Sequence, residues 1–165
     1  MANYAIVRTD LMSGTKDPAL LVSVKYRPSG TDTAIENGNV VLVGSLVTGE
    51  REVYAGDTPA ANSALADIAL IATPELMADE RKKNLNEFRN EAGEIARGYY
   101  LKSKNVFSVT AEAVTPITGT APAVGQIVEL QADTKLKLVA SLTSGSTKVG
   151  EVIAIEGNYI VIRVA

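Results

Sequence analysis

The sequence predicts a mainly β protein of the β-rich α+β class, with one short surface helix. Short runs rich in β-branched residues recur along the 165 residues, separated by Gly, Pro and polar turns. One charged stretch after Thr73 carries helix-start signals, and the pair Gly157-Asn158 between two isoleucine-rich runs is typical of a tight hairpin turn. We therefore expect a β-rich N-terminal domain (residues 1–114), a linker (115–124) and a small C-terminal β barrel or sandwich (125–165).

The first strands are indicated by two kinds of pattern. Residues 4–8 form a short apolar run that suits an edge strand or an extended arm. Residues 20–27 alternate apolar and polar side chains with period two, which predicts a strand with one buried face, ended by Pro28. Residues 39–46 are rich in β-branched side chains and predict a more buried strand.

Three segments follow before the middle of the chain. After a turn at residues 48–49, residues 50–54 predict a polar strand at a sheet edge. The apolar run 65–72 is short, which favours a strand, although its alanines leave a helix open. Thr73, Pro74 and Glu75 then provide a capping hydroxyl, a proline at the first helical position and a carboxylate at the positive end of a helix dipole. They predict a surface helix to Asn90 whose few core residues are Leu76, Met77, Leu85 and Phe88.

The next segments predict a hairpin and a connector. Residues 95–101 and 106–110 flank the polar turn at 102–105, with Tyr99, Leu101 and Phe107 as core members. Gly98 marks a bulge or a close backbone approach. Residues 115–125 contain two prolines, two glycines and no charge, which is the composition of an extended linker.

The C-terminal residues give the clearest pattern. Residues 125–131 and 136–140 predict two strands, and residues 151–156 and 159–164 predict a hairpin. If Glu156 faces Tyr159, then Ile155 faces Ile160 and Ile153 faces Ile162, so the four isoleucines share one side. We expect that side to form the floor of the module.

Composition excludes several kinds of function. The chain has no Cys and no His, so disulfides, thiolate metal sites and the commonest general base are absent. A net charge of -3 argues against broad attraction to nucleic acid. No apolar run reaches the ~20 residues that cross a bilayer, and the N-terminus lacks a signal-peptide pattern. We expect no catalytic residue, no cofactor, no metal, no nucleic-acid or membrane partner, and synthesis in a cytoplasm.

Two motifs resemble chemical sites only superficially. Residues 14–16 and 145–148 each begin with Gly and end in Lys, but neither has the spacing of a phosphate-binding loop, so turn chemistry is the better interpretation. The carboxylate pairs at 50/52 and 91/94 lack the further ordered oxygen ligands of a cation site. We interpret them as surface charge.

Three stretches carry a family resemblance. NGNVVLVGSLVTGEREVY (37–54), ELMADERKKNLNEFRNEAGEIARGYYL (75–101) and NVFSVTAEAV (105–114) resemble capsid decoration, cement or head-fibre proteins of tailed bacteriophages. The C-terminal stretches VGQIVELQADTKLKLV and VGEVIAIEGNYIVIRVA are similar to the small β module of such proteins. The resemblance implies a non-enzymatic virion protein that binds the outer capsid surface, with residues 1–114 attaching to the capsid.

The resemblance also implies partners and a location. The partners would be the major capsid protein and further copies of this chain, with a trimer as one option, on a virion assembled in the bacterial cytoplasm. Alternatives are a tail or baseplate component, or a host-surface or carbohydrate-binding module that stacks Tyr99, Tyr100 or Tyr159 on sugars. The candidate capsid or subunit interface comprises charged and aromatic residues around the expected helix and hairpin: Asp79, Glu80, Arg81, Lys82, Lys83, Phe88, Arg97, Tyr99 and Tyr100.

Overall fold

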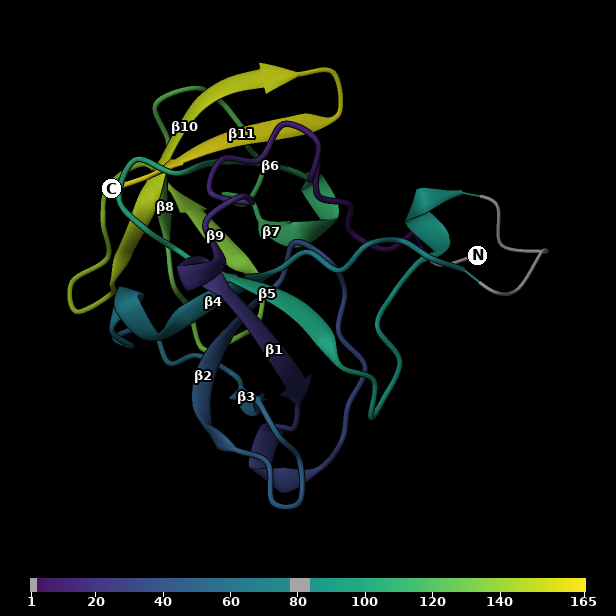
Figure 1. Cartoon of the computed structure of the whole chain (residues 1–165). Coiled ribbons are helices and arrows are strands. Elements are labelled where there is room, and N and C mark those ends of the chain that lie inside the picture. The colour runs from purple at the N-terminus through teal and green to yellow at the C-terminus, as the bar shows by residue number, and fades with distance from the viewer. Residues whose placement is uncertain (1–2, 78–83) are drawn as a thin grey trace.

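The computed structural model describes residues 3–77 and 84–165 and confirms a mainly β fold (Figure 1). The helical segments in these ranges are short 3₁₀ turns: η1 (Pro18–Leu20), η2 (Pro28–Gly30), η3 (Leu65–Asp67), η4 (Leu85–Glu87) and η5 (Ala111–Ala113). The strands are β1 (Leu21–Tyr26), β2 (Val40–Leu46), β3 (Val53–Asp57), β4 (Ile68–Ile71), β5 (Ala96–Tyr100), β6 (Val106–Thr110), β7 (Val114–Thr115), β8 (Ile127–Glu129), β9 (Leu136–Val139), β10 (Lys148–Glu156) and β11 (Tyr159–Val164).

The first layer is a closed barrel with strand order β1-β3-β2-β4-β5, in which β5 returns to pair with β1. Its interior is filled mainly by Val22, Val24, Val41 and Ile71. Two glycines let the walls approach: a Cβ on Gly56 would lie 2.6 Å from Val24, and one on Gly98 would lie 2.8 Å from Val22. The close backbone approach predicted at Gly98 is therefore confirmed.

The second layer is a sheet with strand order β6-β11-β10-β8-β9-β7, above the barrel in Figure 1. The outward face of the barrel supplies Ile68 and Leu70, which belong to one buried cluster with Phe107 and Ile162 of the sheet. Backbone hydrogen bonds add to this contact, since the Val40 N–H donates to the Thr134 carbonyl (2.7 Å). Burying one continuous apolar cluster between the layers fixes each against the other.

The predicted β5–β6 hairpin is wrong, because the two strands lie in different sheets. β5 pairs with β1 and β4, whereas β6 pairs with β11. The connection at 101–105 carries the chain from the barrel to the sheet, and Leu101 is buried in the shared core. The expected linker, residues 115–124, begins at the last residue of β7 and runs toward β8 inside the second sheet. The chain thus changes sheets before the expected linker, and the division into units 1–114 and 125–165 stays a prediction.

The surface helix expected from Thr73 to Asn90 does not form in the described residues. Residues 74–77 are not helical, η4 is a single 3₁₀ turn, and 78–83 lie outside the described residues. The Thr73 hydroxyl, expected to cap a helix, instead accepts a hydrogen bond from the Arg97 N–H (2.9 Å). Leu76 and Leu85, expected to be buried, are 86% and 49% exposed.

The C-terminal hairpin has the predicted turn but only part of the predicted register. Glu156 faces Tyr159 and Ile155 faces Ile160, as expected. A bulge between Val152 and Ala154 then pairs Val152, not Ile153, with Ile162. The shared isoleucine face is therefore confirmed only in part: Ile155 stays opposite buried Ile160, although it is 41% exposed near the hairpin turn, whereas Ile153 no longer lies opposite Ile162. An extra residue in one strand reverses the side on which later side chains lie.

Candidate contact surface

A projecting segment, defined as the described residues of 73–90, includes η4, which stands apart from the two sheets in Figure 1. Its first end is held by Asn37, which is 1% exposed. The Thr73 N–H donates to Asn37 Oδ1 (3.0 Å), and Asn37 Nδ2 donates to the Thr73 carbonyl (2.9 Å) and to Glu75 Oε1 (3.3 Å). One buried amide thus satisfies both backbone groups of Thr73.

The second end is held by Asn90, which is 2% exposed. Asn90 Nδ2 donates to the Ile35 carbonyl (3.1 Å) and to Asn37 Oδ1 (3.3 Å). The backbones of Ile35 and Asn90 exchange two further hydrogen bonds of 2.9 Å. Since both ends are fixed to residues 35–37, the projecting segment begins and ends on a rigid base.

Leu76 stands on a tight turn within this segment. Its N–H donates to the Pro74 carbonyl (2.8 Å), an i to i+2 hydrogen bond that defines a γ-turn. Pro74 has a restricted φ, and the Glu75 carboxylate is bonded to Asn37, so the turn is anchored on both sides of its proline. Leu76 is therefore an apolar side chain presented to solvent by a well-supported backbone.

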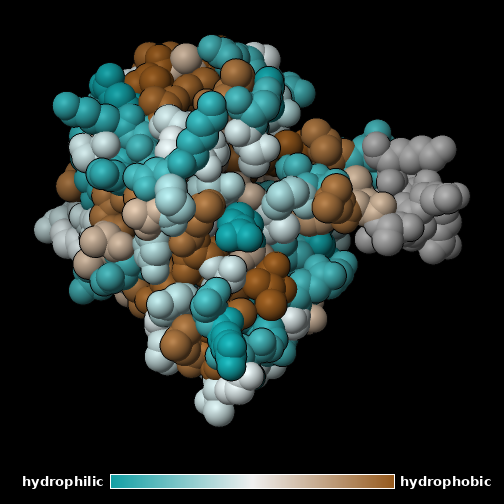
Figure 2. Space-filling model, viewed as in Figure 1, coloured by the Kyte–Doolittle hydropathy of each residue, from teal (hydrophilic) through white to brown (hydrophobic). Residues whose placement is uncertain are grey.

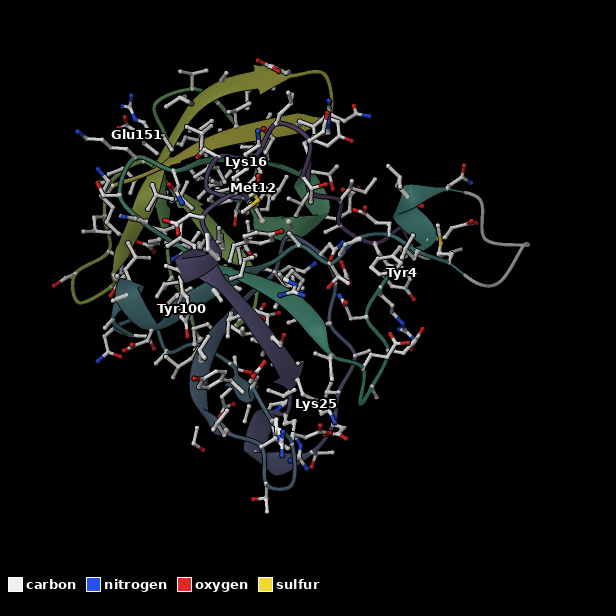
Figure 3. All side chains as sticks on the ribbon, viewed as in Figure 1. Tyr4, Met12, Lys16, Lys25, Tyr100 and Glu151 are labelled. Carbon is white, nitrogen blue, oxygen red and sulfur yellow. The ribbon has the colours of Figure 1, made fainter. Side chains whose placement is uncertain are left out.

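The N-terminal residues lie across the base of the projecting segment. The Tyr4 N–H donates to the Asn86 carbonyl (2.9 Å), and the Arg89 guanidinium lies 5.2 Å from the centre of the Tyr4 ring. Figure 3 shows Tyr4 at this base. Further along, Val7 bridges Val109 at the open side of β6, which confirms the edge position expected for residues 4–8. The N-terminal residues thus join the projecting segment to the edge of the second sheet.

A groove of about 550 Å³ lies between the N-terminal residues, the projecting segment and the tip of the β10–β11 hairpin. Among the lining residues that the structure describes, Glu112 is the one acid, and none is Lys or Arg. Within the described residues, the amide oxygen of Asn86 is buried without a hydrogen-bond partner. Figure 2 shows hydrophobic residues over the hairpin and at the base of the projecting segment. The lining residues are Asn3, Tyr4, Ile6, Asn86, Thr110, Ala111, Glu112, Ala121, Pro122, Ile155, Gly157, Asn158 and Ile160.

The residues predicted as an interface do not form one surface in the described ranges. Phe88 is half-buried and directly follows η4 in the projecting segment. Arg97 is exposed on β5, where half-buried Tyr99 packs on the shared core. Half-buried Tyr100 packs against the barrel interior, and burial raises its pKa, with Tyr54 and Asp67 adding to the effect. The remaining predicted residues, Asp79, Glu80, Arg81, Lys82 and Lys83, lie outside the described residues.

The buried carboxylate of Glu129 has a structural role. It is 1% exposed and accepts hydrogen bonds from the Thr143 N–H and hydroxyl, both 2.8 Å, and from Lys137 Nζ (3.2 Å). Burial alone raises the pKa of Glu129, but these hydrogen bonds and the Lys137 charge together lower it below the ordinary value. The ionised carboxylate therefore ties the loop after β9 to β8.

The motifs that resembled chemical sites are turns or ion pairs. Gly14 and Gly145 both have φ of +84°, and the Thr147 N–H donates to the Ala61 carbonyl (2.8 Å), so the second turn joins the two layers. Glu50 pairs with Lys25 (3.1 Å), and Glu91 pairs with Arg89 (2.9 Å). Among residues 3–77 and 84–165, no cluster of three or more acidic side chains is arranged to hold a metal ion. No helix in the same ranges is long and apolar enough to cross a membrane.

Sequence reasoning missed the residues that form the groove and the exposure of Leu76 on its γ-turn. Leu76 resembled a core residue of a helix, and Ile155 resembled part of a buried isoleucine face. The signal available for Leu76 was its position two residues after Pro74, in a stretch with few other apolar side chains.

No protein-family model matches the chain, and neither a curated protein nor a solved structure matches it.

Proposed function

We propose that this chain is a non-enzymatic structural protein of a bacteriophage virion, which binds the outer surface of the assembled capsid and stabilises the head. The proposal begins from the resemblance of residues 37–54, 75–101 and 105–114 to capsid decoration proteins. The partner is the major capsid protein, and the virion surface is the location.

The observation that carries the proposal is a rigid two-layer scaffold with a clamped projecting segment. The layers share one buried core, and Asn37 and Asn90 fix the ends of the segment. Ordering costs little on binding when the contact elements are already held in place. A modest contact of this kind becomes strong when it repeats over a symmetric shell, because later contacts are effectively intramolecular.

The use of polar groups in the described residues supports a binding role over catalysis. The buried side chains of Asn37, Asn90 and Glu129 hold loops by hydrogen bonds. The sequence contains no His or Cys to serve as a general base or nucleophile. A protein that binds the assembled shell better than its dissociated subunits stabilises the shell by mass action, without any reaction.

A carbohydrate-binding role is less well supported, because its expected aromatic rings have other contacts. Tyr99 packs on the shared core, and Tyr100 packs against the barrel interior. The Arg8 guanidinium lies 5.3 Å from the centre of the Tyr159 ring and covers one face. A tail or baseplate component is distinguished by its position below the portal in images of the virion.

The proposal is tested by comparing the heat and low-salt resistance of purified heads that carry or lack this protein. We expect heads without it to release DNA at a lower temperature and to regain resistance when the protein is added. Equal resistance, with no added protein retained on the heads, would contradict the proposal. Arg97→Glu reverses an exposed charge at the predicted interface and should lower occupancy, while Arg51→Glu, exposed in the β2–β3 turn, is the matched control.

A further inference from the structure

We propose that Asn37 is a latent deamidation site. The clamp formed by Asn37 and Asn90 suppresses the reaction, and its completion loosens the projecting segment irreversibly. Asn37 is followed by Gly38, which makes the one Asn-Gly pair in the chain. Such a pair is prone to deamidation, because a glycine has no side chain to hinder attack by its backbone nitrogen on the asparagine amide. The inference goes beyond capsid binding and does not depend on it.

The fold requires both residues of this pair. Gly38 has a φ of +85°, and a Cβ placed on it would lie 2.9 Å from the Cβ of Ala113, so a side chain is excluded there. Asn37 needs an acceptor and a donor on one short side chain, since it accepts from the Thr73 N–H and donates to the Thr73 carbonyl. An ionised aspartate has no donor. The labile pair is therefore a consequence of the geometry of the clamp.

The reaction uses only hydroxide and water from the solvent. Hydroxide removes the proton of the Gly38 N–H, and the nitrogen attacks Cγ of Asn37. A bond forms between this nitrogen and Cγ, the bond from Cγ to Nδ2 breaks, and Nδ2 leaves as ammonia after taking a proton from water. One water molecule then opens the resulting succinimide to aspartate or isoaspartate. Nothing is oxidised or reduced in either step.

The folded chain holds both reacting groups in other contacts. The Gly38 N–H donates to the Ile71 carbonyl (2.8 Å), and both Asn37 and Gly38 are buried. Hydrogen bonds fix the Asn37 amide at its oxygen and at its nitrogen. Attack on Cγ requires the amide to leave these partners and hydroxide to reach the Gly38 N–H. The reaction therefore proceeds from a locally opened state, and its rate follows the population of that state.

The product does not rebuild the clamp. A carboxylate at position 37 has no proton to donate, so the Thr73 carbonyl and Glu75 Oε1 lose their donor. Nδ2 of Asn37 lies 3.3 Å from Glu75 Oε1, so the carboxylate oxygen that replaces it meets a second negative charge, which repels it. Isoaspartate also adds a carbon to the main chain directly before Gly38. Both products thus loosen the first end of the projecting segment.

The test follows deamidation of the full chain at mildly alkaline pH by peptide mass spectrometry. We expect folded wild-type protein to convert Asn37 at least about a hundredfold more slowly than the same protein unfolded in urea. Asn90→Ala removes a donor to Asn37 Oδ1 and should accelerate conversion about tenfold. Glu75→Ala removes a half-buried acceptor, should accelerate conversion about threefold, and replaces Asn90→Ala if that variant does not fold.

A second variant separates opening of the clamp from global unfolding. Val128→Ala lowers stability in the second sheet without removing a hydrogen bond of the clamp, so conversion of Asn37 should stay within about twofold of wild type. Exposed Asn62, followed by Ser63, is an internal reference whose conversion should be equal in all folded variants. Equal rates in folded and unfolded wild type, or conversion in Asn90→Ala no faster than in Val128→Ala, would overturn the inference.

The consequence of the reaction is tested separately with Asn37→Asp, which has the side chain of one product. Amide exchange at Arg97 should accelerate about tenfold or more, because its N–H is bonded to the Thr73 hydroxyl and depends on the position of Thr73. Asn62→Asp makes the same change at an exposed site and should leave this exchange unchanged. Exchange at Arg97 that is equal in the two variants would overturn the proposed release of the segment.

Discussion

Replacing Asn37 by Ala removes the amide that holds the first end of the projecting segment. The N–H and the carbonyl of Thr73 then lose their hydrogen bonds to Asn37. The Asn90 side-chain amide loses one of its two acceptors. A buried group left without a partner costs about 1–3 kcal/mol, and half-buried Thr73 regains part of this from water. We expect the free energy of unfolding to fall by about 3 kcal/mol, which lowers Tm by about 6–12 °C for a chain of this size.

The measurement is urea and thermal unfolding followed by circular dichroism, with amide hydrogen exchange as a local readout. Exchange should accelerate most at Thr73 and Arg97, because the Arg97 N–H is bonded to the Thr73 hydroxyl. Asn62→Ala, at an exposed asparagine, is the matched control and should change stability by less than about 0.5 kcal/mol. An Asn37→Ala protein as stable as this control, with unchanged exchange at Thr73, would refute the assigned role of the clamp.

Three further changes test the packing and the buried carboxylate. Gly56→Ala should lower the free energy of unfolding by about 1–3 kcal/mol, because the new Cβ would lie 2.6 Å from Val24. In urea titrations, the double variant with Val24→Ala should lose less stability than the sum of the two single variants. Strictly additive losses would contradict the contact between the two residues. Phe107→Ala should lower the free energy of unfolding by about 3–5 kcal/mol, since Phe107 lies in the core shared by both layers. The variant should still unfold in one calorimetric transition. Two separated transitions would indicate that the layers unfold as independent units. Because the folded pKa of Glu129 is lowered, its ionisation stabilises the fold above the ordinary value of 4.5, and this contribution is lost as the pH falls through the folded-state pKa. Glu129→Gln should therefore cost about 2 kcal/mol at pH 7 and progressively less below pH 4.5 in chemical denaturation, and a cost that does not change with pH would contradict this assignment.

Strands were predictable where the pattern is local. The alternation over residues 20–27 gave β1, the β-branched run 39–46 gave β2, and the Gly157-Asn158 turn gave the last hairpin. The close contact at Gly98 was also predictable, because a glycine inside a strand often marks a place where another group approaches the backbone closely. In each case the information lies within a few neighbouring residues.

Long-range pairing was not predictable from such patterns. β1 pairs in parallel with β3 and antiparallel with β5, although 95–101 and 106–110 look like neighbours in a hairpin. The bulge between Val152 and Ala154 puts Val152 in the place opposite Ile162 that the alternating pattern assigns to Ile153. Asn37 and Asn90 are 53 residues apart, so the clamp exists only after the barrel has closed. Without the clamp, the Thr73-Pro74-Glu75 signals favour a helix.

The most direct test of the central claim is a cryo-electron microscopy reconstruction of virions, compared with virions made without this protein. The account predicts repeated additional density on the outer capsid surface, large enough for the two packed layers, that disappears when the protein is absent. Identical capsid surfaces in the two reconstructions, with the protein below the portal or missing from the virion, would contradict it.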